Sequence, residues 1–226
     1  MKEGVIPQLS NMVRYKEILD EIKSVSPSVS LLAVSKTKPF DAIMEAYEEG
    51  AREFGENRVQ EIDDKLAVRP HDMRVYLIGH LQSNKVKKAV SLVDRIESVD
   101  SLRLLKLIEK ECEKIDKKME ILLEVNSSGD ENKSGFEDEE KLFEAAEYAY
   151  QSKYLKLMGL MTIGPLGGDR DKNIESFSYT KKLYDILKGQ YGVSVLSMGM
   201  SCDWHEAIEC GSTEVRIGSA IFGVRV

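Results

Sequence analysis

The sequence predicts an α/β protein: a single (β/α)8 TIM-type barrel with one extra N-terminal helix. Eight short apolar segments suited to buried strands recur along the 226 residues. Between them lie segments whose apolar residues recur three and four positions apart, the spacing of an amphipathic helix. Alternating strands and helices are typical of a parallel sheet, and eight strands match a closed barrel. We expect residues 1–226 to form one domain.

The expected strands are apolar runs bounded by turn residues. In chain order they are residues 31–34, 53–55, 75–78, 95–98, 121–125, 157–161, 195–198 and 214–217. An open, doubly wound sheet is the main alternative fold. That fold normally carries a glycine-rich turn after its first strand, and residues 35–39 contain no glycine. The barrel is therefore the better interpretation.

Capping residues precede several of the expected helices. Side chains that accept hydrogen bonds at a helix start are expected at Asp41, Ser101 and Asp138. The extra helix is expected over residues 6–25, with Pro7 in its first turn and Pro27 beyond its end.

The composition excludes several classes of protein. The net charge of −7 gives no bulk attraction for nucleic acid, and we interpret the basic run at residues 85–88 as a solvated helix face. There is no apolar run long enough for a membrane span and no signal peptide, so we expect no membrane partner. Three cysteines without a C-x-x-C pair suit a reducing, cytoplasmic location.

Two lysines follow the first expected strand, where a barrel places functional groups. Lys36 shares a strand face with Leu32 and Val34, whereas Lys38 lies in the turn that Pro39 forces. We therefore favour Lys36 as an amine that forms a Schiff base. A free lysine has a pKa of about 10.4, and burial at a barrel mouth can lower it enough to give a neutral nucleophile. Two exposed lysines that flank a turn are the alternative.

A possible phosphate site follows the last two expected strands. Gly218 and Ser219 follow the eighth strand, where glycine allows close approach and the serine offers a hydroxyl. Ser201 follows the seventh strand and supplies a second hydroxyl, while Asp203 is suited to cap the next helix. Barrels recurrently bind phosphate at these two loops. A lysine facing such a site indicates a phosphorylated aldehyde.

Other polar residues permit weaker hypotheses. His80 could carry a proton or be a structural histidine, and Met161 could face the pocket floor or belong to the core. The loop at residues 126–135 could gate the mouth, with Lys133 meeting an anion, or be a plain surface loop. Cysteine, histidine and glutamate at positions 202, 205, 206 and 210 match no familiar ligand spacing, so we expect no metal site.

The chain closely resembles the pyridoxal-phosphate homeostasis proteins, a family of alanine-racemase-like, fold-type III barrels. The resemblance runs over nearly the whole sequence. It rests on residues 33–38 (AVSKTK), 54–61 (FGENRVQE), 78–85 (IGHLQSNK), 133–135 (KSG), 159–162 (GLMT), 197–203 (SMGMSCD) and 215–223 (VRIGSAIFG). Trp204 differs from the smaller or sulfur-containing residues that this family has at the corresponding position. We expect the difference to affect only local packing.

The resemblance implies pyridoxal 5′-phosphate (PLP) as the cofactor and assigns roles to site residues. Lys36 would hold it as an internal aldimine, and Asn57 would contact it. Ser201, Gly218 and Ser219 would hold the phosphate. Arg216 would face the pyridine nitrogen, where a permanently charged guanidinium cannot pass a proton to the ring and leaves it a poor electron sink.

The resemblance further implies a carrier that buffers or delivers PLP to apo-enzymes, with no strong turnover and no catalytic residue. Alanine racemases add a β-rich domain with a catalytic tyrosine, and we expect that domain to be absent because the sequence ends at Val226. A PLP-dependent amino-acid racemase, with Lys36 and His80 as bases, remains the main alternative. A Schiff-base aldolase acting on a phosphorylated sugar is a third.

Overall fold

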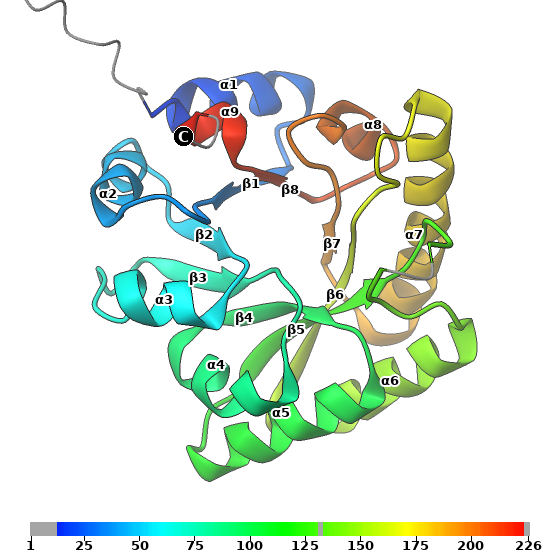
Figure 1. Cartoon of the computed structure of the whole chain (residues 1–226). Coiled ribbons are helices and arrows are strands. Elements are labelled where there is room, and N and C mark those ends of the chain that lie inside the picture. The colour runs from blue at the N-terminus through cyan, green and yellow to red at the C-terminus, as the bar shows by residue number, and fades with distance from the viewer. Residues whose placement is uncertain (1–12, 131–132, 224–226) are drawn as a thin grey trace, which may run out of the picture.

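Eight parallel strands close into a barrel in the computed structural model, which describes residues 13–130 and 133–223. Each strand pairs with the next along the chain, and the last returns to the first (Figure 1). The strands are β1 (Ser30–Val34), β2 (Glu53–Glu56), β3 (Arg74–Leu77), β4 (Arg95–Val99), β5 (Met119–Val125), β6 (Leu155–Thr162), β7 (Val195–Ser197) and β8 (Glu214–Ile217). The predicted barrel is confirmed, and every expected strand overlaps an observed one.

Helices surround the barrel and connect successive strands (Figure 1). They are α1 (Tyr15–Val25), α2 (Phe40–Glu48), α3 (Val59–Leu66), the short 3-10 helix η1 (Ser83–Lys85), α4 (Val86–Leu92), α5 (Leu102–Lys114), α6 (Glu139–Gln151), α7 (Arg170–Tyr191), α8 (Trp204–Glu209) and α9 (Ser219–Phe222). Within the described residues, none of them combines the length and the apolar character that crossing a membrane requires.

The helix starts differ from the sequence expectations at two places. The extra helix was expected from residue 6, but α1 begins at Tyr15 after a non-helical Arg14; Pro7 and residues 6–12 lie outside the described residues. Asp41 is not a cap, because Pro39 occupies that position in extended backbone and Asp41 falls inside the first turn of α2. A negative charge in the first turn is favourable, because the N-terminal end of a helix carries a partial positive charge.

Two caps are confirmed. The Ser101 side chain accepts a hydrogen bond from the backbone N–H of Leu104 at the start of α5, and Asp138 accepts one from Lys141 at the start of α6. Each satisfies a backbone donor that has no partner within its helix. These caps fix where the two helices leave the barrel mouth.

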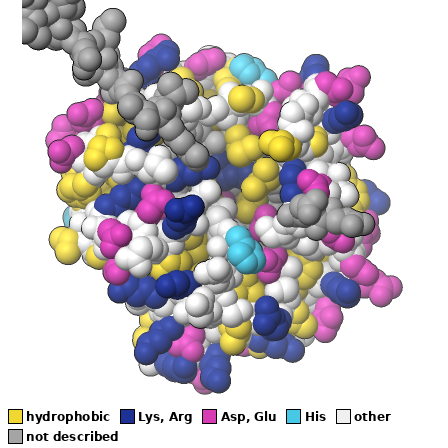
Figure 2. All heavy atoms as spheres, in the orientation of Figure 1, with side chains coloured by type: hydrophobic (Ala, Val, Ile, Leu, Met, Phe, Trp, Pro, Cys, Tyr) yellow, Lys and Arg dark blue, Asp and Glu magenta, His cyan; other side chains and the backbone are white. Residues whose placement is uncertain are grey.

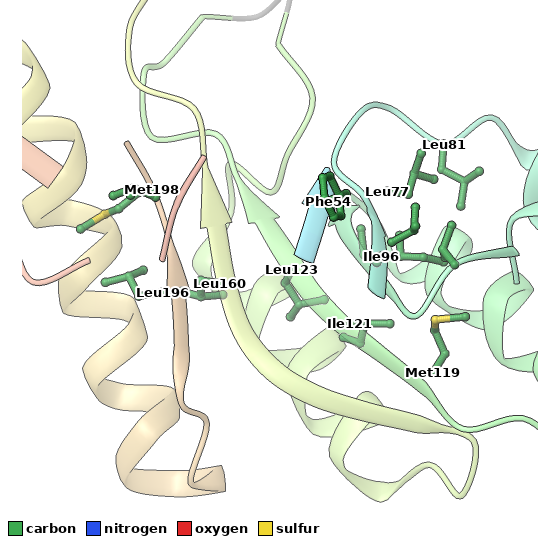
Figure 3. Packing of buried hydrophobic residues seen from close by; sticks show 14 of the residues in the cluster. Phe54, Leu77, Leu81, Ile96, Met119, Ile121, Leu123, Leu160, Leu196 and Met198 are labelled. Atoms are coloured by element: carbon green, nitrogen blue, oxygen red, sulfur yellow. The ribbon is translucent and has the colours of Figure 1, made fainter. Parts of the chain in front are cut away.

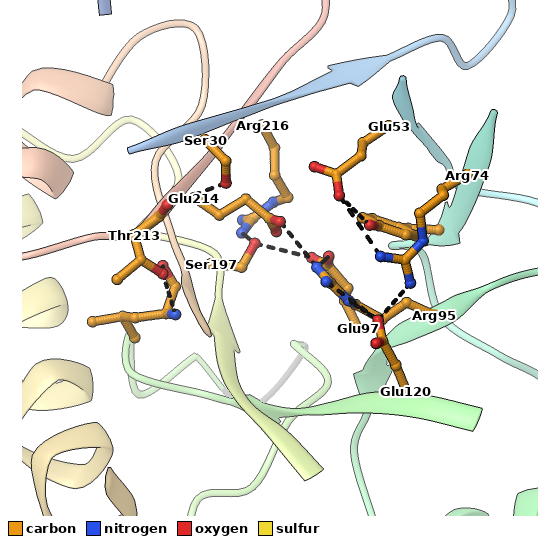
Figure 4. A network of polar contacts seen from close by, with 12 residues as sticks. Ser30, Glu53, Arg74, Arg95, Glu97, Glu120, Ser197, Thr213, Glu214 and Arg216 are labelled. Atoms are coloured by element: carbon orange, nitrogen blue, oxygen red, sulfur yellow. Dashed lines mark hydrogen bonds and ion pairs between the residues drawn. The ribbon is translucent and has the colours of Figure 1, made fainter. Parts of the chain in front are cut away.

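The strands have an apolar outer face and a mostly polar inner face. Outward residues such as Phe54, Ile96 and Leu123 pack with the helices into the main core (Figure 3). Inward residues include a small separate apolar cluster, which comprises Leu32, Val34, Tyr76 and Ile78. The remaining interior carries buried glutamate, arginine and serine side chains (Figure 4). The main hydrophobic core therefore lies between the sheet and the helices.

A bulge interrupts the alternation of β6. Its pairing with β5 shifts register between Ile121 and Leu122, which face Leu157 and Gly159. Gly159 has φ of +153°, and a Cβ there would lie 1.8 Å from the carbonyl oxygen of Val195. Only glycine fits this close approach of β6 to β7.

Candidate functional site

A cavity of about 640 Å³ opens at the mouth of the barrel, between the loops that follow β1, β2, β6, β7 and β8. Lysine, arginine and hydrophobic side chains meet near the centre of this face (Figure 2). The lining includes six of the residues that the sequence singles out as cofactor contacts. These are Lys36, Asn57, Ser201, Arg216, Gly218 and Ser219.

Lys36 and Lys38 are both placed on the cavity by a tight turn after β1. Thr37 between them has φ of +65°, a conformation that few residues other than glycine adopt. The backbone N–H of Lys38 donates to the carbonyl of Ser35 at 3.0 Å and closes the turn. The Thr37 N–H donates to a carboxylate oxygen of Glu61 at 2.7 Å, which stabilises the unusual backbone.

Buried polar contacts support this turn from below. The hydroxyl of Ser35 donates to Glu56 Oε1 at 2.5 Å, and Lys65 Nζ lies 2.8 Å from the same oxygen. Burial raises the pKa of Glu56, and the hydrogen bonds from Lys65 and Ser35 oppose that shift. Lys65 also donates to the carbonyl of Ser35 at 3.0 Å. The contacts among Ser35, Glu56 and Lys65 therefore stabilise the turn that carries Lys36.

Lys38 links this turn to the C-terminal end of α9. Lys38 Nζ donates to the carbonyl oxygens of Phe222 and Gly223, at 2.9 and 3.0 Å. These contacts join the turn after β1 to the end of α9, so Lys38 has a structural task. Lys36 lines the same cavity and continues the inward register of Leu32 and Val34 on β1.

Arg216 enters the cavity from β8 with its side chain almost fully buried. Its Nη1 donates to the hydroxyl of Ser197 at 2.8 Å, and its Nη2 donates to the carbonyl of Thr162 at 2.7 Å. The guanidinium group is thus fixed from β7 and from the end of β6. Because arginine keeps its charge in proteins, the cavity floor carries a permanent cation.

Two hydroxyl groups meet where β8 turns into α9. Ser219 Oγ lies 3.2 Å from Ser201 Oγ, which comes from the loop after β7. Gly218 packs against β1, and a Cβ at this position would lie 3.0 Å from the carbonyl oxygen of Val34. The close packing brings the backbone and both hydroxyls to one side of the cavity.

The loop after β7 is held in place by Asp203. Its Oδ1 accepts a hydrogen bond from the backbone N–H of Met200 at 2.6 Å. Burial raises the pKa of Asp203, while that hydrogen bond opposes the shift. Asp203 occupies the cap position of α8, as expected, but its side chain makes no capping bond to the helix. It orders the loop that presents Ser201.

Three residues that the sequence suggests for the site do not line the cavity: Met161, His80 and Lys133. Met161 is completely buried in β6, and the bulge at Gly159 alters the alternation that a straight strand would follow. His80 lies over a neighbouring hollow, with Nδ1 3.2 Å from Asp100 Oδ2. Lys133 lines another hollow and donates to the carbonyl of Gly164 at 2.8 Å.

Sequence reasoning missed much of the cavity wall, which also includes Val34, Thr37, Ile78, Ile163, Met200, Cys202 and Gly223. For Val34 and Ile78 a signal existed, because each is two residues beyond an inward residue of its own strand. Ile163, Met200 and Cys202 belong to loops, where periodicity carries no information. They could not be assigned to this site.

One family model and several proteins of known name match most of this chain. The family model for the N-terminal domain of alanine racemase matches residues 12–226. A pyridoxal phosphate homeostasis protein of Schizosaccharomyces pombe is 40% identical over 203 residues, which cover 88% of this chain and 85% of the relative. A protein of the same name from Vibrio alginolyticus is 38% identical over 226 residues, which cover 97% and 96%.

Solved structures agree with this relationship. PipY of Synechococcus elongatus, determined without PLP, is 38% identical with a TM-score of 0.86, over 92% of this chain and all of that chain. The structure of PipY with PLP bound matches with a TM-score of 0.83 at 36% identity over the same shares. An alanine racemase of Clostridium difficile shares the fold, with a TM-score of 0.74 at 14% identity over 94% of this chain and 56% of its own.

Proposed function

Because the chain belongs to the alanine racemase N-terminal domain family and, within it, to the pyridoxal phosphate homeostasis proteins, we propose that it binds PLP at the barrel mouth and buffers or delivers it. The cofactor would be held as a Schiff base on Lys36. The observation that carries this proposal is that one cavity is lined by an amine, an arginine and a pair of hydroxyls.

The residues of the cavity fit the chemical groups of PLP. PLP supplies an electrophilic aldehyde carbon, which a neutral amine can attack. Lys36 is the preferred amine, because it lines the cavity and continues the inward register of Leu32 and Val34 on β1. Thr37 and its buried support hold the Lys36 backbone at the rim.

The phosphate would lie between the loops after β7 and β8. Ser201 and Ser219 present hydroxyls that can donate to phosphate oxygens, and the backbone N–H groups after Gly218 add further donors. Asp203 contributes indirectly by ordering the loop that carries Ser201. Such a neutral donor set binds phosphate through hydrogen bonds, in the loops that barrels recurrently use.

Arg216 is the group best placed to face the pyridine nitrogen. Ser197 and Thr162 fix its guanidinium group, which also lines the cavity. A charged arginine can donate a hydrogen bond to the ring nitrogen but does not transfer its proton, so it favours holding the cofactor over stabilising carbanions. His80, which a racemase would use as a second base, lies beside another hollow. The arrangement therefore supports a carrier.

Absorbance titration with PLP tests the proposal. The wild type is expected to develop a Schiff-base band that saturates at one equivalent, and Lys36→Ala is expected to lose it. Lys38→Ala is the matched control, because it removes a lysine from the same turn and cavity and is expected to keep the band. A band that survives Lys36→Ala and disappears in Lys38→Ala would contradict the assignment.

Carrier and racemase are separated by two further measurements. Loaded protein is expected to restore the activity of a PLP-dependent apo-enzyme that has no free PLP available. Incubation with single enantiomers of several amino acids is expected to give no sustained exchange. Rapid racemisation that Lys36→Ala abolishes would make the protein an enzyme.

A further inference from the structure

A chain of buried polar side chains runs from the cavity floor into the barrel interior (Figure 4). We call it the lumen chain; its members are Arg216, Ser197, Glu97, Glu214 and Arg95. They come from β4, β7 and β8, and each is less than 5% exposed. Burying charged groups is costly unless they are paired, so this arrangement requires an explanation beyond packing.

The hydrogen bonds from Arg216 to Glu97 run in one direction. A guanidinium group can only donate, so Arg216 Nη1 donates to Ser197 Oγ at 2.8 Å. The hydroxyl hydrogen of Ser197 is then directed to Glu97 Oε2, 2.9 Å away. Glu97 is therefore connected to Arg216 through one hydroxyl group.

Two carboxyl groups and one guanidinium group continue the chain. Arg95 Nη1 lies 3.4 Å from Glu97 Oε1 and 3.0 Å from Glu214 Oε2. Arg95 is also held by Glu120 Oε2 at 3.4 Å and by the ring of Tyr76, whose centroid lies 4.1 Å from its Cζ. The charge of Arg95 is thus shared among several groups, and it does not belong to Glu97 alone.

Glu97 is the member most strongly affected by its surroundings. Burial and the neighbouring Glu214 raise the pKa of Glu97 well above its ordinary value, while Arg95 and Arg216 oppose the shift. The protonated carboxyl can hydrogen-bond to Glu214 while its other oxygen accepts from Ser197. A neutral Glu97 satisfies the hydroxyl without offsetting the charge of Arg216.

We propose that Ser197 and Glu97 are positioning residues, which hold the Arg216 guanidinium at the cavity floor with its positive charge directed to the pyridine nitrogen of the ligand. This inference rests on the proposed function for the ligand, but the geometry of Arg216 does not depend on it. Ser197 supplies the side-chain contact and the carbonyl of Thr162 supplies the backbone contact. Loss of Ser197 leaves Arg216 held at one end.

The first test is the pH titration of the absorbance band of PLP-loaded protein. Ser197→Ala is expected to move the midpoint by about one pH unit, because a displaced charge is worth on the order of one pKa unit. Ser197→Thr keeps the hydroxyl and is expected to restore the wild-type midpoint. Glu97→Gln, which imitates the protonated acid, is expected to leave it unchanged. An unmoved midpoint in Ser197→Ala would overturn the proposal.

Ser212→Ala is the matched control for general damage. Ser212 is buried beside the same strands, and its hydroxyl oxygen lies 2.8 Å from the carbonyl oxygens of both Met198 and Glu214, so that its one hydrogen can be donated to either. This variant also loses a buried hydroxyl but leaves the Arg216 contacts intact. It is expected to lose stability without moving the midpoint. An equal midpoint shift in Ser212→Ala would show that Ser197 acts only through stability.

A second test needs no cofactor. Side-chain N–H resonances of Arg216, observed by nitrogen-15 NMR, are expected to be protected from hydrogen exchange in the wild type and in Glu97→Gln. They are expected to exchange at least 10-fold faster in Ser197→Ala. Equal exchange in the wild type and Ser197→Ala would reject the positioning role. Protected Arg216 in a protein that fails to bind PLP would reject the proposed function alone.

Discussion

The two faces of the barrel strands differ in chemistry, and β4 shows the difference within three residues. Ile96 points outward into the apolar core, while Arg95 and Glu97 point inward into the charged lumen. Every side chain in this set is almost completely buried. Burial of the outer face provides stability in proportion to apolar area. The inner face needs matched partners, and it carries the groups that reach the cavity.

The comparison predicts that inner-face and outer-face substitutions have separable effects. A change on the outer face should alter the free energy of unfolding and leave the cofactor chemistry of the folded molecules intact. A change at the inner rim should do the reverse. Variants on both faces of the same barrel can therefore test the division.

The largest effect is expected from Lys36→Ala at the inner rim. Loss of the amine should remove covalently held PLP completely. Because Lys36 is only partly buried, the loss in the free energy of unfolding should be smaller than the roughly 2–5 kcal/mol expected for truncating a core side chain. Absorbance and chemical denaturation of the same sample measure both quantities. A loss of several kcal/mol in the free energy of unfolding would contradict the separation between the effects of inner-rim and outer-face substitutions.

Ile96→Ala should give the opposite result. Removing this fully buried outer side chain leaves a cavity in the core, with an expected cost of about 2–5 kcal/mol. The folded fraction should still bind one equivalent of PLP. Urea unfolding monitored by circular dichroism gives the free energy, and a PLP titration below the unfolding transition gives the stoichiometry. A loss of PLP binding by the folded protein would contradict the expectation that outer-face substitutions leave cofactor binding intact.

Glu97→Gln tests the inner face through pH. The folded-state pKa of Glu97 lies above its ordinary value of 4.5, so the stability that it contributes is present below pH 4.5 and is lost as the pH rises toward the folded-state pKa. Glutamine has no such loss. The variant should therefore gain stability relative to the wild type as the pH rises, by about 1.4 kcal/mol for each unit of pKa elevation, until the folded-state pKa is passed.

Urea unfolding of both proteins between pH 4 and pH 8 measures this difference. A constant difference across the range would mean that Glu97 ionises in the folded state as it does in the unfolded state. A variant that becomes relatively less stable with rising pH would mean that Glu97 is held as a carboxylate by Arg95.

The smallest effect is expected from Ser101→Ala, which lies outside both faces. The cap bond to the Leu104 N–H would be lost, at a cost of about 1 kcal/mol. PLP binding should not change. Ser101→Asp should restore the stability, since aspartate is also a good cap. A change in the PLP band would show that the start of α5 is coupled to the cavity.

The fold was predictable because outward residues have a clear sequence signal. Runs such as residues 31–34 are apolar throughout, and the alternation of strands with helical segments predicted the barrel. Boundaries were less certain. β6 extends to Leu155 and Thr162, because pairing with β5 continues beyond the apolar run. Asp41 resembled a cap, but the extended backbone of Pro39 starts α2 earlier.

The candidate site was predictable at the level of strand ends and less so for individual side chains. Six of the residues singled out line one cavity. Met161 lies beyond the bulge at Gly159. A bulge cannot be predicted from the periodicity of apolar residues, so the face on which Met161 lies could not be predicted either. The lumen chain escaped detection because Arg95 and Glu214 are 119 positions apart. Their pairing depends on barrel closure, which a linear pattern does not encode.

The most direct test of the account is borohydride reduction of the protein with one equivalent of PLP, followed by peptide mass mapping. Reduction makes the bond between the amine and the cofactor permanent, so the modified lysine can be identified. We expect the pyridoxyl mass on Lys36 and an unmodified Lys38. Modification of Lys38 or Lys133 with Lys36 intact, or no site-specific modification at all, would contradict it.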